Sequence, residues 1–245
     1  MNTRWAYDSP VHGVSEKYLS MKDLMQAYYS CRGNDTTTAQ AMLEYGCDCD
    51  YPPAKLEMAH LIMTNPAVTL HRRDKYIMAE KLLSELANDL DISNRYAAHV
   101  ALEMAKLYEI LNRPVGMLAM LLRARRLGNT QVHDRDLDLC KRRLKRMDIR
   151  EYGAHPDDAY NLGTELFYAD GPFRFTELFL REAVDAATGE LKGRSCLALA
   201  DLYACNPQEG RMLAEEAFKL YREAEKNGFP DCLVRSTDPK RSHCA

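Results

Sequence analysis

An all-α fold, organised as an α-solenoid of stacked antiparallel helical hairpins, is predicted by the spacing of apolar residues, by the turn residues and by an internal repeat. Apolar residues recur at three- and four-residue steps along almost the whole chain. Alternating runs of β-branched residues, which are typical of strands, are missing. Glycine and proline divide the chain into segments of helix length, and similar segments recur after a few tens of residues.

The composition is that of a folded protein. Of 245 residues, 46% are hydrophobic and 28% charged, which excludes general disorder and fibrous sequences. We predict one helical repeat domain over residues 15–234, with flexible ends at 1–14 and 235–245. The first residues lack the apolar run of a secretory signal, and no stretch is apolar enough to span a membrane. We therefore expect a cytoplasmic protein without a membrane segment.

The stretch from Asn94 to Asn112 shows the helical pattern most clearly. Ala98 and Ala105 fall on one face, whereas Glu103 and Lys106 occupy other faces. About ten helices are expected between glycine, asparagine and proline breaks, because glycine ends helices at positive φ and proline cannot continue them. The breaks lie at Gly33, Gly46, Asn65-Pro66, Arg113-Pro114, Gly128-Asn129, Gly153, Gly171-Pro172, Gly189, Asn206-Pro207 and Gly228-Phe229-Pro230.

The internal repeat indicates helical hairpins. Leu56–Ile62 matches Leu102–Tyr108 at a spacing of 46 positions (56 to 102), Leu197–Tyr203 repeats the pattern, and Tyr160–Gly163 begins a weaker copy. Because a single hairpin cannot bury its apolar faces, the units must stack. Each copy is followed by a second amphipathic segment, at Tyr76–Leu86, Met117–Leu127, Leu178–Ala187 and Leu213–Lys226. Small residues that allow close helix approach are Ala59, Ala105, Gly163 and Ala200.

The end of the last unit, Ala214–Cys232, resembles the second helix of Sel-one-like repeats, a branch of the tetratricopeptide-like superfamily, and Ala119–Asn129 is a looser copy. The resemblance extends over residues 52–234. The 46-residue spacing and an additional segment, Asp134–Met147, depart from the family pattern. The resemblance implies a solenoid that acts as a non-catalytic adaptor or scaffold for other proteins.

The eight cysteines include no Cys-x-x-Cys pair, so we expect mostly reduced thiols. Cys196 and Cys205 resemble the disulfide pair of a secreted branch of the same family. Without a signal peptide, buried thiols are the preferred interpretation.

Two clusters raise the question of metal chemistry. Cys47-Asp48-Cys49-Asp50, with Cys31 and His60, contains soft ligands, but their spacing fits a turn that begins at Gly46 better than a zinc site. The acids of His133–Asp138 suggest either a divalent-ion site of the phosphohydrolase kind or a capped helix start, and we favour the capped start. Phosphate-binding loops, nucleophile elbows and His-Glu-x-x-His motifs are missing from the sequence. We predict no enzyme, catalytic residue, metal or cofactor.

The charge distribution is uneven. Residues 113–150 carry eleven basic and four acidic residues, a net charge of +7, so the remainder carries −10 of the total of −3. This basic segment indicates an acidic protein partner, a solvated face or a nucleic-acid site. The overall pI near 6.2 and the few interleaved aromatic residues argue against a dedicated nucleic-acid binder.

A protein partner is therefore the first hypothesis, and a regulator that contacts nucleic acid through residues 113–150 is the alternative. The candidate residues belong either to the basic segment or to the polar face of the first helices, which would line the concave side of a right-handed stack. Those of the basic segment are Arg123, Arg126, Arg142, Arg143, Lys145 and Arg146. Those of the first helices are Glu57, His60, Glu103, Lys106, Glu165 and Asp201.

Overall fold

The computed structural model describes residues 20–65, 72–89, 92–148, 154–169, 171–206 and 211–230. Within these ranges the chain forms eleven α-helices and no strand, which confirms the all-α fold class. The chain divides into two compact units, Met1–Ser93 and Asn94–Ala245. The predicted flexible ends lie outside the described residues, and a single repeat domain over residues 15–234 stays a prediction.

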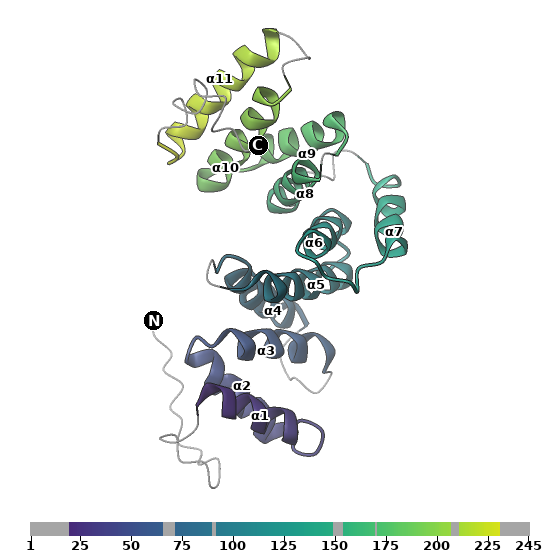
Figure 1. The fold of residues 1–245 in the computed structure, drawn as a ribbon, viewed down its shortest axis with the longest axis vertical. Helices are drawn as coiled ribbons and strands as arrows, with labels where there is room; N and C mark the ends of the chain where they lie inside the picture. Colours follow the sequence, from purple (N-terminus) through teal and green to yellow (C-terminus); the bar gives the residue numbers. More distant parts are fainter. Residues whose placement is uncertain are drawn as a thin grey trace. The chain divides into compact units, whose positions relative to one another are not determined.

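In its described residues the first unit has four helices (Figure 1). Each packs against the next along the chain, α1 on α2, α2 on α3 and α3 on α4. Ser20 caps the first of them, since its hydroxyl accepts the Asp23 N–H at 3.2 Å. The bounds are α1 (Met21–Cys31), α2 (Thr36–Asp48), α3 (Pro52–Thr64) and α4 (Arg72–Ala87).

Where the structure describes the second unit, it contains three helical hairpins and one further helix (Figure 1). The hairpins are α5–α6, α8–α9 and α10–α11, and neighbouring hairpins meet where α6 packs on α8 and α9 on α10. Helix α7 packs on α6. The bounds are α5 (Asn94–Ile110), α6 (Pro114–Arg126), α7 (Asp134–Leu144), α8 (Pro156–Tyr168), α9 (Phe173–Ala186), α10 (Gly189–Ala204) and α11 (Arg211–Lys226).

Close packing at small residues is confirmed. Ala59, Ala105 and Ala200 are buried. A Cβ on Gly163 of α8 would lie 2.6 Å from Cδ2 of Leu180 in α9, so a larger residue at that position would have to displace the Leu180 side chain. The repeat-derived pairs of helices are thus real hairpins, whereas their arrangement as a solenoid stays a prediction.

Some of the predicted helix breaks agree with the structure and one does not. Gly128 and Gly228 follow α6 and α11 with φ of 88° and 98°, the left-handed conformation that glycine favours. The predicted break at Gly46 is wrong, because α2 continues to Asp48 and the turn is made by Cys49 and Asp50. Gly46 is buried, and a Cβ there would collide with Ala54 of α3. It serves helix packing.

No helix in the described ranges combines the length and the apolar character needed to cross a membrane.

Candidate partner-binding surface

The carboxylates predicted for the polar face of the first helices are occupied by contacts inside the chain. Glu57 on α3 accepts hydrogen bonds from the hydroxyls of Tyr28 at 3.3 Å and Tyr29 at 2.8 Å on α1. Arg32 lies 3.9 Å from the same carboxylate. Burial, followed by the hydrogen bond to Glu57, raises the pKa of Tyr29. Glu57 therefore joins α1 to α3.

Glu103 and Asp201 are also paired inside the chain, Glu103 within α5 and Asp201 with α11. Glu103 is only 3% exposed and accepts a hydrogen bond from Lys106 Nζ at 2.6 Å. Asp201 on α10 accepts the Tyr221 hydroxyl of α11 at 2.7 Å. Within this predicted group His60 is exposed. These carboxylates are therefore engaged in contacts within or between helices of the same chain.

The arginines of the basic segment are also largely paired. Arg126 at the end of α6 makes a two-pronged contact with Glu165 of α8, at 2.8 Å from Nε and 2.7 Å from Nη2. Its guanidinium lies 5.1 Å from the centre of the Tyr168 ring. The hydrogen bond to Glu165 raises the pKa of Arg126 above its already high usual value. Arg126 and Glu165 join neighbouring hairpins, and Arg123 is half-buried.

A second pair of this kind lies deeper between the same helices. Arg113 donates to Asp158 from Nε at 2.9 Å and from Nη2 at 2.7 Å, and the Asp158 side chain is 2% exposed. The Tyr108 ring centre lies 4.4 Å from the guanidinium. Gly116 leaves the space for the carboxylate, since a Cβ there would be 2.6 Å from Asp158 Oδ1.

Helix α7 is held on the hairpins at both of its ends. At its start Arg125 pairs with Asp134 at 2.5 Å, and the His133 N–H donates to the Asp136 carboxylate at 3.2 Å. The acids of His133–Asp138 thus complement the helix start, as the sequence indicates. Near its end Arg143 pairs with Glu109 of α5 at 3.4 Å. The apolar side chains buried under the helix are those of Leu137, Cys140 and Leu144.

Among the described cations of the basic segment, Arg135 stands between Asp134 and Asp136 in the sequence, and three others beyond these pairs have no acid of the chain as a partner. The side chains of Arg142, Lys145 and Arg146 are exposed, and none makes a hydrogen bond or ion pair within the described part of the chain. Arg142 lies in the last turn of α7, and Lys145 and Arg146 lie just past its end. Cations are favoured here by the helix dipole. We call these three residues the basic end of α7.

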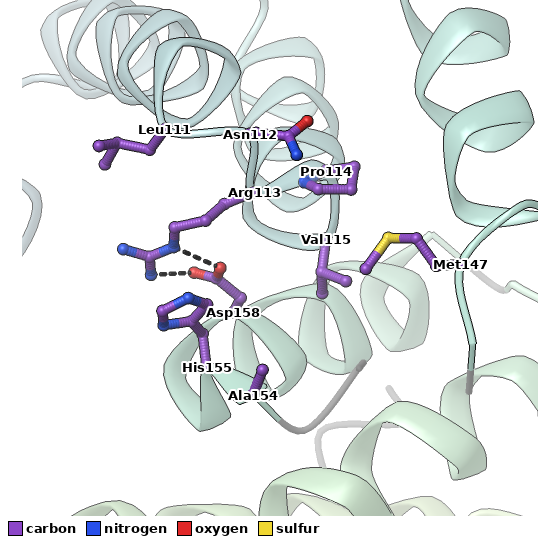
Figure 2. Close-up of a pocket in the computed structure, with 9 residues that line it drawn as sticks. All are labelled: Leu111, Asn112, Arg113, Pro114, Val115, Met147, Ala154, His155 and Asp158. Carbon is purple, nitrogen blue, oxygen red and sulfur yellow. Dashed lines mark hydrogen bonds and ion pairs between the residues drawn. The ribbon is translucent and has the colours of Figure 1, made fainter. Parts of the chain in front are cut away.

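A small pocket opens beside the basic end of α7 (Figure 2). Its volume is about 250 Å³. The turn between α5 and α6, the residue after Arg146 and the start of α8 contribute its walls. The lining residues are Leu111, Asn112, Arg113, Pro114, Val115, Met147, Ala154, His155 and Asp158.

No sequence pattern predicts this pocket. Arg113-Pro114 is predicted as a helix break at the start of the basic segment, and Asp158 belongs to no predicted site. The pairing of Arg113 with Asp158 joins residues 45 positions apart, and no local pattern reports such a contact. A close approach at Gly116 is equally invisible, because the sequence around it predicts an ordinary helix.

The cysteines within the described ranges form no metal-binding cluster. Cys31, Cys47, Cys49, Cys140 and Cys196 are free thiols. Cys205 is disulfide-bonded, so the interpretation as a buried thiol is wrong for Cys205, and the free Cys196 is not its partner. Burial raises the pKa of Cys47 to about 12 and that of Cys140 and Cys196 to about 11. Among the described residues no three His, Cys, Asp or Glu side chains are placed to hold a metal ion together.

Comparison of the chain with protein-family models, curated proteins and solved structures finds no match. The resemblance to Sel-one-like repeats therefore rests on the residues quoted for it.

Proposed function

We propose that this protein is a non-catalytic scaffold of helical hairpins that binds an acidic segment of another protein through the basic end of α7. The observation that carries the proposal is the contrast between this end and its surroundings. Arg113, Arg126 and Arg143 are neutralised by acids of the same chain. Arg142, Lys145 and Arg146 are exposed without such acids.

The neutralised arginines are expected to contribute little to binding, because a cation that already has an acidic partner gains little free energy from a second one. An acidic segment is attracted by all three exposed cations, which lie close together in the chain. This attraction speeds association, most strongly at low ionic strength. Helix α7 suits this role, since the pairs at its ends and its three buried apolar side chains hold the cations on a preformed surface.

The test is a double charge reversal, Arg142→Glu with Arg146→Glu. We expect loss of the retained proteins in a pull-down analysed by mass spectrometry, with a melting temperature close to that of the original protein, because both side chains are exposed. The matched control is Arg174→Glu with Lys219→Glu. It changes net charge equally at exposed cations that also have no partner within the described ranges.

Capture that survives the reversal would place binding elsewhere and contradict the proposal. The alternative, a nucleic-acid regulator, predicts a different result. The double reversal would weaken binding to unrelated oligonucleotides alike and reduce the salt dependence of affinity by about two units, one for each lost phosphate contact.

A further inference from the structure

The pocket beside the basic end of α7 is apolar on most of its walls. Leu111, Pro114, Val115, Met147 and Ala154 provide these walls, and Figure 2 shows Met147 and Val115 facing one another across the opening. Its volume of about 250 Å³ is below that of pockets that hold drug-sized molecules, which start at about 300 Å³. A cavity of this size and lining suits a single apolar side chain.

The charged groups in the pocket do not call for a charged ligand. Arg113 and Asp158 form a closed two-pronged pair, which leaves the floor close to neutral. An anion would compete with Asp158 for Arg113, and a cation would compete with Arg113 for Asp158. The pocket therefore favours an apolar group of a ligand, whereas the acidic groups of the ligand bind at the basic end of α7.

The pocket and the basic end of α7 adjoin one another along the chain. Met147 lines the pocket, and Lys145 and Arg146 directly precede it in the chain. At the rim, the Asn112 amide and the His155 ring make no hydrogen bond within the described part of the chain. Both side chains can form hydrogen bonds with the backbone of a bound peptide. Asp148 follows Met147 in the chain and would repel acidic groups. The acids of a ligand are therefore favoured on the side of Arg142.

From this juxtaposition we infer that the acidic segment bound by the protein carries one large apolar residue, which inserts into the pocket while acidic neighbours contact Arg142, Lys145 and Arg146. The inference rests on the proposed function and refines it. An anchor of this kind adds affinity through burial of apolar surface and fixes the register of the segment on the cations. Charge alone would leave the segment free to slide.

The experiment uses the full chain and two fluorescein-labelled acidic decapeptides, identical except for a central Leu or Ala, with binding followed by fluorescence anisotropy. We expect the Leu peptide to bind about tenfold more tightly than the Ala peptide. Ala154→Trp, at an exposed position in the pocket wall, should remove this preference by filling the pocket. The matched control, Ala169→Trp, changes an exposed alanine that does not line the pocket and should keep it.

Met147→Glu provides a second variant, because a carboxylate in the wall should repel the acidic ligand and remove the Leu preference without filling the space. Equal binding of the Leu and Ala peptides, or a preference that survives Ala154→Trp, would overturn the inference. If binding of both peptides still depended on Arg142 and Arg146, the proposed function would stand. Failure of both peptides, with or without binding of a single-stranded oligonucleotide, would overturn both proposals.

Discussion

Arginines held between an aromatic ring and a carboxylate recur in both compact units. Arg32 lies over Tyr29, and Arg181 over Tyr203, at 5.1 and 5.6 Å from the ring centres. Arg181 also contacts Glu216 of α11 at 3.0 Å. A planar guanidinium can stack on a ring and bind a carboxylate at the same time, which an ammonium group cannot do as well. At the residue scale these arginines tie helices together.

The Arg113–Asp158 pair depends on the absence of a side chain at position 116. Gly116→Ala would stabilise an isolated helix by about 1 kcal/mol. Here the added Cβ would displace the Asp158 carboxylate from Arg113 and leave a buried charge poorly paired, so we expect a net loss of about 2 kcal/mol in the free energy of unfolding. Urea denaturation measures the loss.

Gly33→Ala is the matched control. Nothing lies within 4 Å of a Cβ at Gly33, and its φ is not positive, so the free energy of unfolding should change by less than about 0.5 kcal/mol. Stabilisation by Gly116→Ala would show that helix propensity outweighs the ion pair at this position.

At the scale of the helix, the hairpin is the unit that buries apolar surface. Helix α5 presents Ala98, Ala101 and Ala105 as buried positions, whereas Lys106 is exposed. Helix α11 completes its hairpin with Ala217, Tyr221 and Ala224 against α10. Small residues shorten the distance between paired helices, so their tolerance to larger side chains is low.

Ala105→Glu should therefore lower the free energy of unfolding by several kcal/mol, because the carboxylate would be forced into the buried side of α5. Thermal melting followed by circular dichroism measures the change. Ala214→Glu is the control, since it adds the same group at an exposed position in the first turn of α11. Equal melting of the two variants would contradict the burial of Ala105.

At the scale of the whole chain, the two compact units each bury their own helices. The second unit packs its three hairpins in succession through α6 with α8 and α9 with α10. Since hairpins of this kind gain stability mainly from their nearest neighbours, contacts within one unit should be sufficient for folding.

A fragment of residues 94–245 should thus give a strongly helical far-ultraviolet circular dichroism spectrum and melt cooperatively. The full chain, measured in parallel, should be helical as well. A fragment that melts without cooperativity would support the single repeat domain over 15–234 that the composition and the repeat predict.

The periodicity of apolar residues by itself determines the helices and their pairing into hairpins, because both depend on interactions between residues near each other in the chain. It correctly predicts α5 and the buried alanines, and the acids of the first turn correctly predict the capped start of α7. The rule that glycine ends helices fails at Gly46, where glycine instead allows α2 to approach α3.

The candidate site, in contrast, depends on contacts between residues that are far apart in the chain. The sequence marks residues 113–150 as basic, but which of these cations are neutralised depends on carboxylates 39 and 45 positions away, at Glu165 and Asp158. Only the tertiary structure brings those acids to Arg126 and Arg113 and leaves Arg142, Lys145 and Arg146 exposed. The pocket beside them has the same origin, since its walls come from separate segments that meet only when the hairpins pack. Local periodicity reports which face of a helix is apolar, whereas long-range packing decides which charges meet.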